Sequence, residues 1–186
     1  MKISMKKIVH FFLMPILARN KKFIECHKGE TCYIVGNGSS LKYMDLGDFS
    51  DHPAIGLNFL CLHKEFRKLD IRYYVLLESF FSYPYKKNIY DGKLFRPNLL
   101  GRLFYKSFFK SNDIPLFTSA TNILGWLPKN IFYLYHFGSK TPNRDHIRID
   151  EEFSFMSGAL YGGIALAINM GFKKAYLLGC DYLNTP

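Results

Sequence analysis

The stretch Thr31–Lys42 constrains the fold of this chain more than any other. Its first part, Tyr33–Val35, is a short run of β-branched and aromatic residues bounded by turn residues, which predicts a buried strand. The strand runs directly into Gly36–Ser40, which we call the glycine turn, and a serine there would cap a short helix through Leu41. A strand, a glycine-rich turn and a helix start together bind phosphate groups in nucleotide-binding α/β folds.

The glycine turn matches neither of two common phosphate motifs. Leu41 stands where the dinucleotide fingerprint has its third glycine, and the Lys-Ser/Thr pair of a P-loop is absent. Glycines at positions 36 and 38 would let the backbone approach a ligand closely and leave N–H groups free for an anion. Two interpretations therefore stay open, a nucleotide-binding loop and a simple tight turn.

Short apolar runs alternate with segments that can form helices. The runs Pro53–Leu57 and Ile71–Leu77 predict a second and a third strand, and Phe59–Lys68 between them predicts a crossover helix. This alternation predicts an α/β fold, a Rossmann-like, doubly wound and mostly parallel sheet with helices on both faces. Further strands are predicted at Ile114–Thr118 and Ile131–Tyr135, and a polar loop at His136–Ile149.

Polar residues follow the first three predicted strands. Asn37, Asn58 and Glu78 each stand at a carboxyl end. Because ligands of open α/β sheets bind outside these ends, the arrangement favours a nucleotide-binding role for the glycine turn.

The C-terminal part adds a helix and a strand. Ala159–Met170 is rich in small residues, and three glycines around its first turns indicate a backbone that lies close against a sheet or a ligand. Ser157 would cap this helix, whose N-terminus would be a second anion site. Gly171 ends the helix, and the strand Ala175–Leu178 brings Asp181 to another strand end. Asp181 is either a ligand-binding residue or a turn-capping aspartate.

Length and charge limit the organisation and the partners. A chain of 186 residues forms one domain, or one domain with an N-terminal appendage, so we expect a basic amphipathic segment over residues 1–28 and a Rossmann-like nucleotide-binding domain over 29–186. A net charge of +10 favours nucleotide phosphates, nucleic acid or an anionic membrane as partners. The four cysteines show no Cys-x-x-Cys spacing, so neither a zinc site nor a redox pair is indicated, and free thiols fit the cytoplasm. The sequence shows no metal-ligand cluster, and we expect no cofactor.

Two stretches each admit two interpretations. Met1–Lys22 could lie in the plane of an anionic membrane or pack on the domain as a helix. Its expected apolar face comprises Ile8, Phe11, Phe12, Pro15 and Ile16. Ser79–Lys110 interleaves aromatic and cationic residues, which fits either a nucleic-acid-binding surface or a helix with a solvated basic face.

Two of these segments resemble a known family. Val35–Lys42 resembles the Gly-Asn-Gly-Pro-Ser-Leu start of the bacterial sialyltransferases of glycosyltransferase family 42. Met156–Gly158 and Leu178–Tyr182 resemble that family's Ser-Gly helix and its Gly-x-Asp strand end. The related MptE-like, 6-hydroxymethylpterin pyrophosphokinase-like domains share both patterns.

The resemblance implies a cytidine nucleotide sugar as donor, and a glycan or lipid-linked acceptor, in the synthesis of bacterial surface polysaccharide or lipooligosaccharide. The free thiols favour a cytoplasmic protein, and the basic N-terminal segment leaves peripheral contact at the inner face of the membrane open, as a homo-oligomer also stays open. The residues that would then contact the donor are Gly36, Asn37, Gly38 and Ser39 at phosphate and ribose, Asn58, Ser157 and Gly158 elsewhere, and Asp181 at ribose or base.

The chain also departs from this family. Ser39 stands where proline is usual, Glu78 where a neutral side chain is commoner, and Leu183 where the family has a second tyrosine. The family's catalytic histidine lies downstream of the aspartate segment, so we expect the chain to be truncated at its C-terminus and assign no catalytic residue. His136 and His146 are candidates for the base by residue type alone.

Two other functions remain open. An MptE-like pyrophosphokinase would need Mg²⁺, for which Asp45, Asp48 and Asp51 are the candidate ligands. A basic adaptor for a membrane surface or nucleic acid would keep the fold without the chemistry.

Overall fold

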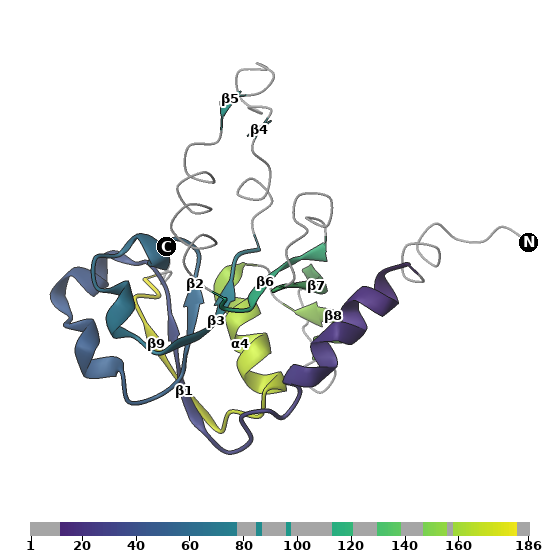
Figure 1. The fold of residues 1–186 in the computed structure, drawn as a ribbon, viewed down its shortest axis with the longest axis horizontal. Coiled ribbons are helices and arrows are strands. Elements are labelled where there is room, and N and C mark those ends of the chain that lie inside the picture. The colour runs from purple at the N-terminus through teal and green to yellow at the C-terminus, as the bar shows by residue number, and fades with distance from the viewer. Residues whose placement is uncertain are drawn as a thin grey trace, which may run out of the picture.

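Seven parallel strands form the centre of the molecule. The computed structural model describes residues 12–77, 85–86, 96–97, 113–120, 130–138, 147–155 and 158–181 (Figure 1). The strand order is β8-β7-β6-β3-β2-β1-β9, and every neighbouring pair is parallel. The strands are β1 (Thr31–Val35), β2 (Ala54–Leu57), β3 (Ile71–Val75), β6 (Leu116–Ser119), β7 (Ile131–Gly138), β8 (Glu152–Phe155) and β9 (Lys174–Leu178). A separate antiparallel pair joins β4 (Tyr85–Lys86) to β5 (Arg96–Pro97).

Helices cover both faces of the sheet, which confirms the predicted Rossmann-like α/β fold. On one face α4 (Ala159–Asn169) packs against β1, β2 and β3. The opposite face is covered by helical residues 12–17 and by short 3₁₀ helices, whose apolar side chains share one core with that side of the strands. These are η2 (Ser39–Tyr43), η3 (Leu46–Phe49), η4 (Leu60–Leu62) and η5 (Phe66–Lys68). Strands buried on both faces read as continuous apolar runs, which is why β1 and β2 were predictable.

The chain reverses its direction across the sheet at β1. From β1 it adds β2, β3, β6, β7 and β8 on one side, and it then returns through α4 to place β9 on the other side of β1. The carboxyl ends of β1 and β9 therefore flank a topological switch point, where open α/β sheets bind their ligands.

The glycines of α4 serve close packing against the sheet, as predicted. A Cβ atom on Gly162 would lie 2.9 Å from a Leu77 methyl group, and one on Gly163 would lie 3.0 Å from a Leu57 methyl group. Gly171, with φ +82°, ends the helix just after Asn169. The small residues thus bring this helix backbone down onto β2 and β3.

The N-terminal segment, where the structure describes it, packs on the domain. Leu13 and Leu17 are buried in the core on the sheet face opposite α4. In η1 (Ala18–Phe23), Asn20 donates hydrogen bonds to the carbonyl oxygens of Tyr133, at 2.8 Å, and Ile149, at 2.6 Å. Of the two interpretations of this segment, the packed helix is the one observed for residues 12–23.

The buried face of this segment differs from the expected one. Phe12 is 68% exposed and Pro15 is also exposed, whereas Ile8 and Phe11 lie outside the described residues. Ile16, from the expected face, is partly buried against the same core, so the buried stripe is shifted toward Leu13 and Leu17. In the described ranges, no helix is both long and apolar enough to cross a membrane.

Two local predictions were wrong. Phe59–Lys68 forms the 3₁₀ helices η4 and η5 and no continuous crossover helix. The His63 ring accepts the Glu65 backbone N–H at 3.2 Å, which takes that donor away from a helical hydrogen bond. The predicted loop His136–Ile149 begins inside β7, because residues 135–138 pair with β8, a strand that was not predicted. Within Ser79–Lys110 the structure describes only β4 and β5, so the helix expected there lies outside the described residues.

Candidate functional site

The predicted site residues gather at the carboxyl ends of β1, β2 and β9. Gly36, Asn37, Gly38 and Ser39 follow β1 directly, and Asp181 lies three residues after β9. The structure brings Asp181 into direct contact with the glycine turn. Asn58 follows β2, and Gly158 precedes the first residue of α4. Ser157 and Glu78 lie outside the described residues.

Asp181 holds the glycine turn through three hydrogen bonds. Its carboxylate accepts from the Ser39 hydroxyl at 3.1 Å, from the Ser40 backbone N–H at 2.8 Å and from the Ser40 hydroxyl. The Ser40 hydroxyl and backbone N–H, with further help from Ser39, lower the pKa of the Asp181 carboxyl below its ordinary value. The carboxylate thus occupies the donors at the start of η2.

The two glycines of the turn are explained by contact with β9. A Cβ atom on Gly36 would lie 2.4 Å from the Gly179 carbonyl oxygen, and one on Gly38 would lie 2.4 Å from the Asp181 carboxyl carbon. Their N–H groups, which we expected to be free for an anion, donate to the carbonyl oxygens of Leu178 and Gly179, each at 2.8 Å. The close approach observed is therefore between two turns of the chain, and contact with a ligand stays a prediction.

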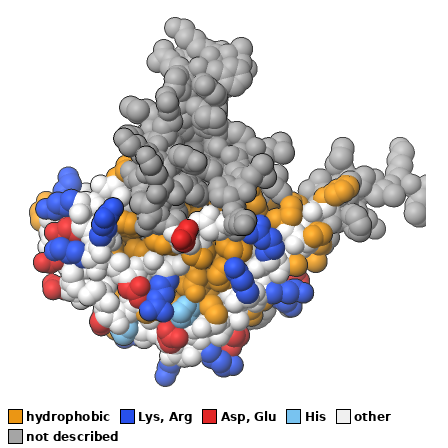
Figure 2. Space-filling model, in the orientation of Figure 1, with side chains coloured by type: hydrophobic (Ala, Val, Ile, Leu, Met, Phe, Trp, Pro, Cys, Tyr) orange, Lys and Arg blue, Asp and Glu red, His pale blue; other side chains and the backbone are white. Residues whose placement is uncertain are grey.

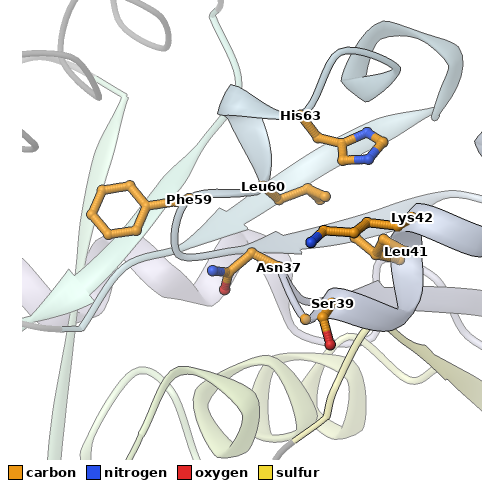
Figure 3. A pocket seen from close by; sticks show the side chains of 8 residues that line it. Asn37, Ser39, Leu41, Lys42, Phe59, Leu60 and His63 are labelled. Carbon is orange, nitrogen blue, oxygen red and sulfur yellow. The ribbon is translucent and has the colours of Figure 1, made fainter.

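A pocket of about 380 Å³ opens beside the glycine turn (Figure 3). This volume falls in the range of small-molecule sites, roughly 300–1,000 Å³. One wall comes from the turn and η2, and the other from η4 and its flanks. The lining residues, none of them acidic, are Asn37, Gly38, Ser39, Leu41, Lys42, Phe59, Leu60 and His63. We call it the η2–η4 pocket.

Tyr74, a residue of β3, positions the η4 wall of this pocket through hydrogen bonds to the backbone. Its side chain is fully buried, and its hydroxyl donates to the Asn58 carbonyl oxygen and accepts from the Cys61 backbone N–H, both at 2.9 Å. Burial raises the pKa of Tyr74 well above its ordinary value, so the hydroxyl stays protonated. Gly56 makes room for the ring, because a Cβ atom there would lie 2.6 Å from it. Tyr74 thereby ties the end of β2 to η4.

Asn58 and Gly158 are not brought into the η2–η4 pocket. The Asn58 side-chain oxygen is buried, and it accepts no hydrogen bond from the part of the chain that the structure describes. Its backbone lies at φ 50°, a left-handed conformation that asparagine tolerates better than most residues. Gly158, at φ +109°, has open space around its Cα. Neither residue is among those that line the pocket.

The sequence analysis did not assign four residues to the site. Lys42, Phe59 and His63 line the pocket, and Tyr74 positions one of its walls. Lys42 could have been found, because it directly follows the glycine turn on the predicted helix. The aromatic residues and the histidine carry no such mark, since they read as part of ordinary apolar or amphipathic segments.

Two of the three aspartates considered as magnesium ligands have other partners. Asp45 accepts from Lys68 at 2.7 Å, and Asp51 accepts from the Tyr33 hydroxyl at 2.8 Å. No group of three or more His, Cys, Asp or Glu side chains that could hold a metal ion occurs among the described residues. The geometry therefore gives no support to Asp45, Asp48 and Asp51 as a joint metal site.

The architecture defines an α/β protein, and its pocket lies at the carboxyl ends of β1 and β2, next to the switch point of the sheet. Comparisons of the chain with family models, curated proteins and solved structures return no match.

The contact between Asp181 and the serines predicts an acid-sensitive contribution to stability. Because the pKa of Asp181 is lowered in the folded state, the contact stabilises the fold above the ordinary carboxyl pKa, and the stabilisation is lost as pH falls through the lowered value. We expect Asp181→Asn to reduce the melting temperature at about pH 7 and to have less effect at about pH 3. Asp48→Asn, at an exposed aspartate elsewhere, is the control. An equal effect of Asp181→Asn at both pH values would contradict the assignment.

Proposed function

We propose that this chain is the donor-binding part of a glycosyltransferase that uses a nucleotide-activated sugar, a CMP-sugar in the sialyltransferase-like case. One observation carries the proposal, the η2–η4 pocket beside the switch point between β1 and β9. Its position, its size and its mixture of cationic, amide and apolar side chains suit a nucleotide, which combines a charged phosphate with a flat, partly apolar base.

The chemistry required is the departure of a nucleotide phosphate and the loss of a proton from the acceptor hydroxyl. Positive charge and hydrogen-bond donors at the pocket would stabilise the phosphate as its bond to the sugar breaks. A general base would take the proton. His136 is poorly placed for that role, because it belongs to β7, and three strands separate β7 from β1. At about 4.8 Å per strand, the distance across the sheet is roughly 19 Å. His146 lies outside the described residues.

The acceptor in this proposal is a glycan or a lipid-linked glycan of the bacterial surface, and the protein contacts the anionic inner face of the membrane peripherally. The net charge of +10 supports this part. Figure 2 shows Lys and Arg side chains distributed over the visible face, with Asp and Glu side chains interspersed among them. In residues 12–23, the exposed side chains that would take part are Phe12, Arg19, Lys21 and Lys22.

Ligand-dependent unfolding tests the proposal. We expect CMP, in the presence of EDTA, to raise the melting temperature, because a ligand that binds only the folded state stabilises it by about 2.7 kcal/mol at roughly one hundred times Kd. Asn37→Ala removes an exposed amide of the pocket and should weaken CMP binding about two- to tenfold. ATP and AMP serve as comparison ligands.

Two outcomes would contradict the proposal. Stabilisation by ATP only with Mg²⁺ would favour the pyrophosphokinase. No response to any nucleotide would favour the adaptor.

A further inference from the structure

We propose that the phosphate of the nucleotide binds to Lys42 and His63, across the η2–η4 pocket, and that the glycine turn does not hold it. This inference rests on the proposed function and names the part of the site that recognises the anion. It differs from the role expected for Gly36–Ser39 in the sequence.

The glycine and serine donors of the glycine turn are largely engaged, and the Asn37 amide is the side-chain donor of the turn that lines the pocket. The hydroxyl groups of Ser39 and Ser40 and the Ser40 backbone N–H all donate to Asp181. The N–H groups of Gly36 and Gly38 donate to backbone carbonyl oxygens of the β9 end. A phosphate placed here would meet a carboxylate of its own sign and would have to displace it to gain a hydrogen bond.

Lys42 offers an uncommitted positive charge at the same pocket. Figure 3 shows its side chain extended from η2 into the pocket. Lys68, by contrast, is engaged, since it contacts Asp45 at 2.7 Å and Glu65 at 3.3 Å. Lys42 forms no ion pair or hydrogen bond with any residue that the structure describes. No acidic side chain lines the pocket, so an anionic ligand would be the partner of this ammonium group.

His63 faces Lys42 from the η4 side and presents a donor. Its Nδ1 accepts the Glu65 backbone N–H at 3.2 Å, which requires a lone pair on that nitrogen. The neutral ring therefore carries its proton on Nε2, the nitrogen left to face a ligand. A ring in this state can donate to a phosphate oxygen but has no free lone pair with which to act as a general base. The geometry thus assigns His63 to binding.

The rest of the pocket suits the nucleoside part. Leu41, Phe59 and Leu60 supply apolar and aromatic surface next to the two donors. An inorganic anion would leave this apolar surface uncovered, whereas a base and a ribose would pack against it. The ligand class is therefore a nucleoside phosphate, and the phosphate should account for a measurable part of the affinity.

Calorimetry with CMP and with cytidine separates the phosphate contribution from the rest. We expect the wild-type chain to bind CMP about 10- to 100-fold more tightly than cytidine, as charge-assisted hydrogen bonds typically give. Lys42→Gln should reduce CMP affinity about tenfold or more and leave cytidine affinity unchanged. Lys64→Gln removes the same charge from an exposed residue outside the pocket lining, next in sequence to His63, and should change neither.

Two substitutions of His63 distinguish the roles of its two ring nitrogens. Asparagine places its side-chain oxygen near the Nδ1 position, so His63→Asn keeps the bond to the Glu65 N–H and loses the pocket donor. Glutamine places its amide near the Nε2 position, so His63→Gln keeps a pocket donor. CMP affinity should therefore fall more in His63→Asn than in His63→Gln, with both variants folded and cytidine affinity equal in both.

Each outcome decides one proposal. If Lys42→Gln leaves the CMP-to-cytidine ratio unchanged, the phosphate does not bind at Lys42 and this inference fails. If the wild-type chain binds CMP and cytidine equally well, the inference fails although the nucleotide pocket stands. If neither ligand binds, the proposed function fails, and the inference fails with it.

Discussion

Replacing Gly36 with alanine should lower the free energy of unfolding by about 2–3 kcal/mol, a typical cost of overpacking a close contact. The new Cβ atom would lie 2.4 Å from the Gly179 carbonyl oxygen and 3.1 Å from its carbon. Both are backbone atoms, so no side-chain rotation relieves the clash, and the carboxyl ends of β1 and β9 must separate. Urea denaturation measures the effect as a lower midpoint at an unchanged slope.

Gly29→Ala is the matched control for this substitution. Gly29 has φ +82° and no atom within 4 Å of an added Cβ, so its replacement costs only conformational strain, about 1 kcal/mol. A Gly36→Ala variant no less stable than Gly29→Ala would contradict the close contact between the two turns.

The comparison also bears on the candidate site, because a glycine-turn variant that loses ligand binding together with stability says nothing about ligand contact. Substitutions at Lys42 and Asn37, which are exposed, avoid this difficulty.

Leu17→Ala should destabilise the chain by about 2–5 kcal/mol. Leu17 is fully buried and belongs to the core between the N-terminal helix and the sheet, so its truncation leaves a cavity. The segment that holds it was expected to be an appendage, and a large effect would make residues 12–23 part of the folded unit. Thermal or urea unfolding, followed by circular dichroism, measures the change.

Phe12→Ala in the same segment is the control for Leu17→Ala. Phe12 is 68% exposed, so removing its larger side chain should change stability by no more than about 0.5 kcal/mol. Equal effects of the two substitutions would mean that the segment is not docked as the structure has it.

The sheet was largely predictable because its strands obey a simple physical rule. A parallel strand buried on both faces must be apolar at nearly every position, and β1 and β2 have this pattern. The helix α4 was predictable to within one residue at its C-terminal end, because Gly171 stops it. The structure between β2 and β3 was not, since side-chain contacts to the backbone, such as that from the Glu65 N–H to His63, compete with helical hydrogen bonds and leave no mark in the apolar pattern.

The site was predictable as a set of strand ends but not as a set of contacts. Polar residues after β1, β2 and β9 had to lie on one edge of a parallel sheet. That Asp181 would bind Ser39 and Ser40 depends on β1 and β9 being neighbours, and strand order leaves no trace in local sequence patterns. Tyr74 shows the same limit, because within an apolar run it reads as core, and only the fold shows which groups its hydroxyl joins.

The contact between Ser40 and Asp181 joins residues 141 positions apart, and this separation orders the events of folding. Contacts between distant residues must overcome the entropy of closing the chain between them, so they form late and slow the reaction. A ribosome releases β1 long before β9, and until β9 docks the glycine turn lacks the carboxylate that holds it. We therefore expect the strands from β1 to β8 to assemble first, and the glycine turn to become able to bind a ligand only once β9 has docked.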